Sequence, residues 1–140
     1  MMLNWTDRYL QIPFLHGGRG FGGCDCGGLV LLALREEKGV RATDFTRYES
    51  HDFRYPGGYE KIGRGIQQLL DKEWLEVDPD FPRPFDLVRF RYGRAACHVG
   101  LYVGEGLFLH VEEGLGYARL TPLADRYWGR NFIEFKRHRE

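Results

Sequence analysis

The residue best placed to do chemistry is Cys26, which follows a glycine-rich stretch and Asp25. Asp25 is a good N-cap residue, and the apolar run after Gly28 predicts a buried helix over residues 26–38 that ends at Gly39. Cys26 would then lie in the first helical turn, where unpaired backbone N–H groups and the positive end of the helix dipole favour a thiolate. We therefore predict a cysteine that is nucleophilic near neutral pH.

A cysteine nucleophile needs a base that removes its proton and a further group that orients the base. His98 and His110 are the candidates, and they lie on two predicted strands joined through residues 104–106. A two-residue turn would point the two rings to opposite faces. A three-residue loop, or an equivalent bulge, pairs position 110 with Gly100 and brings both rings to one face. An irregular turn with Gly106 in the left-handed region is therefore a structural prediction of the catalytic interpretation.

Helices are expected before strands along the chain. The sequence predicts a short helix over residues 4–11, the helix that begins at Cys26, and a second amphipathic helix from Tyr59 to about Trp74, after an irregular aromatic segment over residues 40–58. Apolar and polar residues then alternate in five predicted strands. This order indicates a single α+β domain over residues 1–140 with a mostly antiparallel sheet. The predicted strands are Asp86–Tyr92, His98–Val103, Leu107–Val111, Tyr117–Leu120 and Phe132–Phe135.

Composition excludes several classes of function. The chain has 140 residues with 20 basic and 20 acidic side chains, so it lacks the positive field that non-specific nucleic-acid binding requires. No apolar run approaches the length of about 20 residues that a membrane-spanning helix needs. Three cysteines indicate reduced thiols rather than a disulfide framework. The first residues contain no secretory signal pattern, so we expect synthesis in the cytoplasm without a signal peptide.

Four motifs follow one another along the chain: Asp25-Cys26-Gly27-Gly28-Leu29-Val30, Asp86-Leu87-Val88, His98-Val99-Gly100-Leu101-Tyr102 and Phe108-Leu109-His110. In this order and spacing they resemble the motifs of the NlpC/P60 cysteine peptidases. The resemblance covers roughly residues 10 to 135 and implies a papain-like fold, with N-terminal helices packed on a five- to six-stranded sheet. The stretches His16-Gly17-Gly18-Arg19 and Cys24-Asp25-Cys26 are similar to the branch of the family found in phage tails and gene transfer agents.

The resemblance implies hydrolysis of amide bonds in peptidoglycan stem peptides, often between D-glutamate and a diamino acid, without a cofactor. Cys26, His98 and His110 would form the catalytic triad, and backbone N–H groups at the start of the helix would bind the oxyanion. His16, Arg19 and Asp25 are the predicted substrate-binding residues. The expected partners are the peptidoglycan peptide and proteins of a tail or particle, which would carry the enzyme to the cell wall.

Two departures from the family pattern concern the substrate rather than the triad. Phe14 stands where many members have tyrosine, and Phe85 stands where glycine is common before the aspartate.

Other interpretations of the same residues stay open. Cys24, Cys26, His98 and His110 have the side-chain types of a tetrahedral zinc site, although a C-x-C pair with distant histidines is not a usual spacing. A structural tail protein could also retain the fold without needing turnover. Cys24 is a second thiol, a resolving cysteine or a structural residue, of which we favour the last. Cys97 is expected to point to the other side of its strand from His98.

Overall fold

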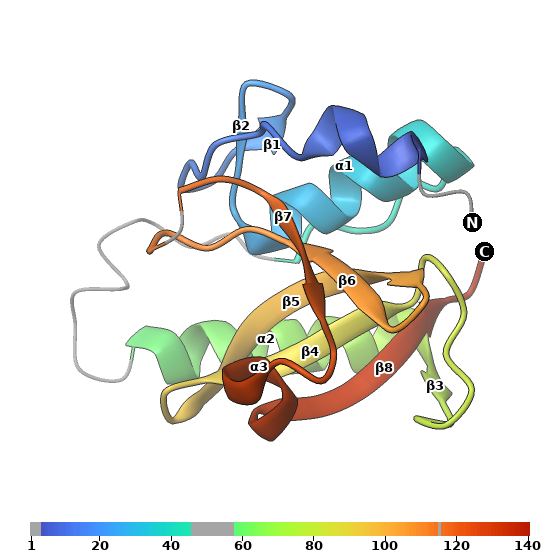
Figure 1. Ribbon diagram of the computed structural model, residues 1–140. Coiled ribbons are helices and arrows are strands. Elements are labelled where there is room, and N and C mark those ends of the chain that lie inside the picture. The colour runs from blue at the N-terminus through green and yellow to red at the C-terminus, as the bar shows by residue number, and fades with distance from the viewer. Residues whose placement is uncertain (1–3, 46–57, 115) are drawn as a thin grey trace.

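The computed structural model describes residues 4–45, 58–114 and 116–140, and there two helices pack on one face of a six-stranded antiparallel sheet (Figure 1). The strand order is β3-β8-β4-β5-β6-β7. This architecture confirms the predicted α+β fold with helices before strands. The elements are η1 Asn4–Tyr9, β1 Arg19–Gly20, β2 Gly23–Cys24, α1 Cys26–Lys38, α2 Gly58–Glu73, β3 Trp74–Val77, β4 Leu87–Tyr92, β5 Ala95–Gly104, β6 Leu107–His110, β7 Arg119–Pro122, α3 Arg126–Arg130 and β8 Phe132–His138.

Helix α1 has the bounds that the sequence predicts. The side chain of Asp25 caps its start by accepting a hydrogen bond of 2.7 Å from the Gly28 N–H. At the other end Gly39 has a φ of 65°, a left-handed conformation that glycine adopts without steric cost. Because most of the apolar side chains between these caps are buried, the helix holds Cys26 in a fixed position against the sheet.

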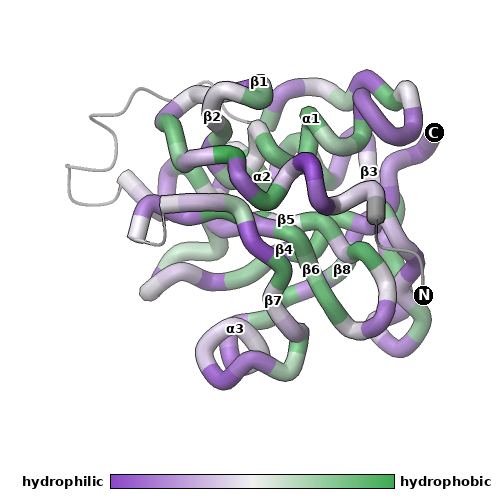
Figure 2. Tube along the Cα trace, turned by 45° about the horizontal axis from the view of Figure 1, so that its top comes forward, coloured by the Kyte–Doolittle hydropathy of each residue, from purple (hydrophilic) through white to green (hydrophobic). Residues whose placement is uncertain are grey.

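Neighbouring residues of the central strands face two different cores. Leu87 and Leu101 belong to the larger core, which α1 and α2 cover, whereas Val88 and Tyr102 face a smaller core closed by Trp128 of α3. This is the alternation of side chains that a strand buried on both faces requires. Figure 2 shows the hydrophobic colour running along β6 and little of it on α3.

The turn between β5 and β6 is irregular, as the catalytic interpretation requires. Leu101 pairs with Leu109, but the register shifts before Gly104, which pairs with Leu107. The residues from Gly104 to Gly106 all have positive φ, including 72° at Gly106. The predicted return of both histidines to one face is therefore confirmed, through a bulge and a short turn rather than through a three-residue loop.

Several elements differ from the predictions. Trp74 begins the edge strand β3 instead of ending α2, and α3 and the two-residue strands β1 and β2 were not predicted. The aromatic segment around Tyr48 and Tyr55 lies outside the described residues. No helix in the described ranges combines the length and the apolar character needed to cross a bilayer.

Phe85 occupies a position with a φ of 76°, where a residue without a side chain would be unstrained. Its ring stacks on Trp5 of η1, with 4.8 Å between the ring centroids. The next residue, Asp86, is buried and accepts two hydrogen bonds from Arg137 at 2.7 and 2.8 Å. These contacts join the start of β4 to η1 and to the end of β8.

Candidate active site

Cys26 begins α1 and lies at the wall of a small cavity of about 70 Å³. Its side chain is partly exposed, and its Sγ lies 3.9 Å from the carbonyl oxygen of Cys97 on β5. Because His98 is the next residue of that strand and lines the same cavity, the thiol and the imidazole share one small space. Phe14, at the position of the family's tyrosine, also lines this cavity.

The glycine-rich loop is fastened to the start of α1 by the buried carboxylate of Asp25. This carboxylate accepts hydrogen bonds from Arg19 Nη1 at 2.6 Å, from the Gly28 N–H at 2.7 Å and from the Gly17 N–H at 3.1 Å. The guanidinium of Arg19 also binds Asp44 through two hydrogen bonds of 2.8 Å. These bonds fix the backbone on both sides of the nucleophile.

Close backbone packing adds to this attachment. A Cβ placed on Gly28 would lie 1.9 Å from the carbonyl oxygen of Gly18, so the loop touches the helix where no side chain fits. The sequence motif therefore needs glycine at position 28 for a steric reason as well as an aspartate at position 25.

Two histidines and a threonine form a hydrogen-bonded chain beside Cys26. His98 Nε2 lies 2.9 Å from His110 Nδ1, and His110 Nε2 lies 2.9 Å from Thr121 Oγ1. If the Nε2 atoms of both rings carry the protons, His98 donates to His110 and His110 donates to Thr121. This arrangement leaves the Nδ1 lone pair of His98 as the group that can accept the proton of the thiol.

The register of the sheet explains why these three residues meet. The β5–β6 pairing places Gly100 opposite His110, so His98 is the diagonal neighbour of His110 across a position without a side chain. On β7 the partner of His110 is Arg119, and Thr121 is two residues further on the same face. The predicted pair His98 and His110 is therefore brought together, and Thr121 is a member of the chain that the sequence did not indicate.

Trp128 holds the rings of both histidines. Its indole stacks on His98 with 4.4 Å between centroids and a 24° interplanar angle, and it meets His110 edge-on at 5.3 Å. No sequence pattern links Trp128 to the histidines, because α3 reaches them only through the tertiary fold. The N-cap residue Asp125, which accepts hydrogen bonds from the backbone N–H groups of Tyr127 and Trp128, was the available signal for this helix.

The resting thiol of Cys26 is protonated, contrary to the expectation from its helix position. Burial raises the pKa of Cys26 to about 12, and the negative charge of Asp25 acts in the same direction. Backbone N–H groups of Val99 and Gly27 lower the pKa, but by less. The prediction of a thiolate near neutral pH is therefore wrong for the unliganded site, because desolvation outweighs the helix dipole.

Both histidines are neutral in this state. Burial lowers the pKa of His98 well below 6.5, and the neighbouring His110 adds to this effect. Burial, with a smaller contribution from Arg119, lowers the pKa of His110 to about 3. The unliganded site thus holds a thiol next to a neutral imidazole, which is ready to accept a second proton.

The predicted substrate-binding residues lie near the nucleophile but differ in their contacts. The ring of His16 lines the cavity and lies 3.0 Å from Glu113, with Phe14 packed edge-on against it. Arg19 and Asp25 bind each other, which gives them a positioning role. A direct contact of His16, Arg19 or Asp25 with the substrate stays a prediction.

Of the other two cysteines, Cys97 lines the cavity of Cys26 and Cys24 does not. Cys24 is fully buried and donates to the carbonyl oxygen of Gly20 at 3.2 Å, and burial raises its pKa to about 11. Cys97 belongs to the core under α1 and α2. Among the described residues, no three His, Cys, Asp or Glu side chains are grouped to hold a metal ion, so the geometry does not support the zinc alternative.

A cysteine at the start of a buried helix, packed against an antiparallel sheet whose neighbouring strands carry a hydrogen-bonded histidine pair, defines the papain-like class of cysteine hydrolases. The model of the NlpC/P60 family matches residues 11–137, and the chain belongs to that family.

Individual relatives agree with this assignment. The probable endopeptidase NlpC of Escherichia coli (strain K12) is 27% identical over 127 residues, which cover 89% of this chain and 68% of that protein. The murein DD-endopeptidase MepS/murein LD-carboxypeptidase of the same strain is 27% identical over 134 residues, covering 94% of this chain and 60% of that protein. The chain therefore spans only about two thirds or less of the length of these relatives.

Solved structures show the same fold. An NlpC/P60 family protein from Bacillus cereus superposes with a TM-score of 0.67 at 18% identity, covering 97% of this chain and 38% of that one.

Proposed function

We propose that this protein is a cysteine hydrolase that cleaves an amide bond in peptidoglycan stem peptides, of the D-glutamyl–diamino acid endopeptidase type. The observation that carries the proposal is the hydrogen-bonded chain from Thr121 through His110 to His98, at the cavity that holds Cys26. The names of the two Escherichia coli relatives, both endopeptidases, support the reaction type.

In the proposed reaction, His98 Nδ1 takes the proton of Cys26 as the sulfur attacks the amide carbonyl carbon. Backbone N–H groups at the start of α1, including that of Cys26, stabilise the oxyanion. The imidazolium of His98 then protonates the leaving amine as the C–N bond breaks, and an acyl-enzyme remains. Water, deprotonated by His98, attacks the thioester and restores the thiol.

The neutral resting pair fits this sequence of steps. His110 accepts a hydrogen bond from His98 Nε2 throughout and thereby fixes the tautomer that presents Nδ1. A substrate that binds next to Cys26 displaces water and brings an electrophile to the sulfur, so proton transfer accompanies attack instead of preceding it.

Isolated peptidoglycan digested with wild type and with Cys26→Ala tests the proposal. Mass spectrometry of the released fragments should show cleavage by the wild type alone, and the fragment masses identify the bond. If wild type and Cys26→Ala both leave the sacculus intact, the proposed hydrolase function is wrong.

The proposal includes a setting, namely a phage tail or a gene transfer agent particle that carries the enzyme to the cell wall. Its support is the motif His16-Gly17-Gly18-Arg19 together with Cys24-Asp25-Cys26. Proteomic analysis of purified particles should find the protein at a fixed ratio to tail proteins. Particles in which Cys26→Ala protein supports normal infection would favour the rival structural role.

A further inference from the structure

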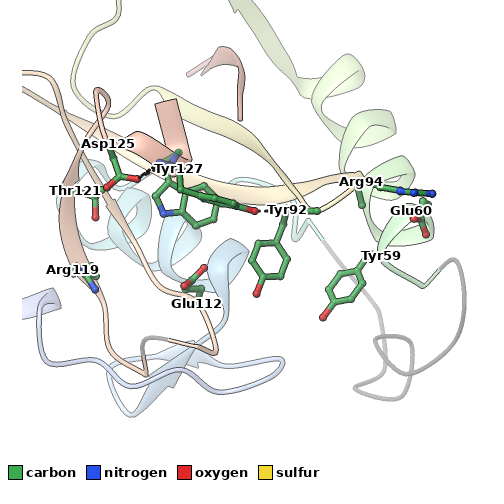
Figure 3. A pocket seen from close by; sticks show the side chains of 12 residues that line it. Tyr59, Glu60, Tyr92, Arg94, Glu112, Arg119, Thr121, Asp125 and Tyr127 are labelled. Carbon is green, nitrogen blue, oxygen red and sulfur yellow. Dashed lines mark hydrogen bonds between the residues drawn. The ribbon is translucent and has the colours of Figure 1, made fainter. Parts of the chain in front are cut away.

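A second and larger pocket, of about 800 Å³, adjoins the catalytic cavity (Figure 3). Tyr59, Tyr92 and Glu112 line both spaces and therefore mark the passage between them. Thr121, which is hydrogen-bonded to His110, and Trp128, which contacts both histidine rings, line the larger pocket. The histidine pair thus lies between the cavity of the nucleophile and this pocket.

The sizes of the two spaces indicate where a peptide substrate must lie. A cavity of about 70 Å³ has the volume of a few atoms, whereas ligand pockets usually measure about 300–1,000 Å³. Only the reacting amide can enter the small cavity, so residues next to the scissile bond extend into the pocket of about 800 Å³. The side chains of that pocket then determine which substrate residue is accepted.

Glu112 is the acidic group at the junction. It follows β6 two residues after His110, it is partly buried, and its Oε2 atom is buried without a hydrogen-bond partner among the described residues. A buried carboxylate oxygen without a donor is unfavourable, and the burial raises the pKa of Glu112 above its ordinary value. A donor with a positive charge would satisfy this oxygen.

Arg119 supplies the opposite charge in the same pocket. It stands on β7 opposite His110, its side chain is exposed, and it forms no ion pair within the described ranges. Arg119 and Glu112 line the same pocket, and the charge of Arg119 lowers the pKa of Glu112. The carboxylate of Asp125 in the same pocket already accepts two backbone hydrogen bonds as the N-cap of α3.

We propose that Glu112 and Arg119 form a subsite for the zwitterionic amino-acid end of a diamino acid residue, with Glu112 binding the ammonium and Arg119 the carboxylate. The inference rests on the proposed function, since it concerns the residue next to the cleaved bond. A free carboxylate is a ligand for the guanidinium of Arg119, and an ammonium supplies the missing donor to Glu112 Oε2. A ligand with only an ammonium or only a carboxylate would bind one of these two side chains and leave the other without a partner.

The tyrosine rings that line the pocket suit the methylene chain of the diamino acid side chain. Tyr59 and Tyr92 lie with ring centroids 6.0 Å apart, and their phenol groups point the same way in Figure 3. Tyr92 stacks on Trp128, and Tyr127 meets Trp128 at 88°, so both rings are less free to stack on a sugar ring. The methylene chain of a diamino acid fits such partly covered rings.

The test measures binding to the inactive Cys26→Ala protein by isothermal titration calorimetry. Three otherwise identical stem peptides carry diaminopimelate, lysine or Nε-acetyl-lysine, which present both charged groups, the ammonium only, or neither. Affinity should fall about tenfold at each step, the loss expected for one charge-assisted hydrogen bond. Glu112→Gln should remove the difference between lysine and acetyl-lysine, and Arg119→Gln the difference between diaminopimelate and lysine.

Glu76→Gln, on the exposed edge strand β3, is the matched control and should leave all three affinities unchanged. Equal binding of the three peptides, or no binding of any, would overturn the subsite. Cleavage assays keep the two proposals apart. Wild type that cuts all three peptides equally well refutes the subsite and leaves the hydrolase, whereas graded binding without cleavage by wild type supports the subsite and refutes the hydrolase.

Discussion

Replacing Asp25 by asparagine removes one negative charge from the junction between the glycine-rich loop and α1, while the shape of the side chain stays almost the same. An amide oxygen in the Oδ1 position still accepts from the Gly28 N–H and from Arg19. The amide nitrogen in the Oδ2 position cannot accept from the Gly17 N–H. We expect this variant to fold less stably and yet to have a more acidic thiol at Cys26.

The expected loss of stability follows from these three hydrogen bonds. At Oδ1 the bond from Gly28 changes from charge-assisted to neutral, and the bond from Arg19 changes from an ion pair to a hydrogen bond with one charged partner, at about 1 kcal/mol each. The loss of the Gly17 bond costs about 1 kcal/mol more. The sum is about 3 kcal/mol, or about 10 °C in Tm for a chain of this size. Arg19 keeps its two hydrogen bonds to Asp44, so the penalty stays below that of an isolated buried charge.

Urea denaturation measures the stability, and the pH dependence of alkylation by iodoacetamide measures the thiol. Cys26 should be labelled before Cys24 and Cys97, because it alone of the three is partly exposed. In Asp25→Asn the alkylation profile should shift to lower pH, since the charge of Asp25 raises the pKa of Cys26.

Asp44→Asn is the matched control, because Asp44 binds the same guanidinium from a more exposed position. It should cost only about 0–1 kcal/mol and leave the alkylation profile unchanged. If Asp25→Asn loses no more stability than Asp44→Asn, or if its thiol becomes less acidic, the account of this junction is wrong.

Three further predictions concern the histidine pair. Gly100→Ala would place a Cβ 3.0 Å from the Leu109 carbonyl oxygen and 3.2 Å from the His110 Cβ. We expect β6 to shift and kcat/KM to fall about 100-fold, because the two histidines are then misaligned. Proton NMR should show the loss of the imidazole N–H signal of the pair. Trp128→Leu should destabilise the fold by about 2–3 kcal/mol, lower kcat more than it raises KM, and raise the pKa of His98 in NMR titration as burial decreases. Because the histidine pKa values are lower in the folded than in the unfolded chain, stability should be fully present above pH 6.5 and fall toward pH 3, by about 1.4 kcal/mol per pH unit for each extra proton bound on unfolding. Urea midpoints should show a shallower fall for His110→Gln, and an equal slope in both proteins would contradict this reasoning.

Much of the fold could be predicted because its signals are local. Asp25 and Gly39 mark the ends of α1 in the sequence itself, and the alternation along β4 to β6 reflects two buried faces. Even the irregular turn at Gly104 follows from the requirement that two histidines share a face. These features depend on residues that are neighbours along the chain or across one hairpin.

The missed parts of the site depend on contacts that no local pattern encodes. Thr121 joins the hydrogen-bonded chain only because the register of β7 on β6 places it two residues beyond Arg119. Trp128 reaches His98 only after α3 folds over the smaller core. The pKa of Cys26 depends on its depth of burial, which is a property of the whole fold. The position of Cys26 at the start of a helix therefore does not predict this pKa by itself.

The protonated resting state of Cys26 affects how readily its sulfur is oxidised. Hydrogen peroxide oxidises thiolates and attacks thiols only slowly, so the unliganded enzyme should resist conversion of its nucleophile to sulfenic and sulfinic acids. Activity would then persist through long exposure to air and oxidants, and become vulnerable only while a substrate occupies the cavity.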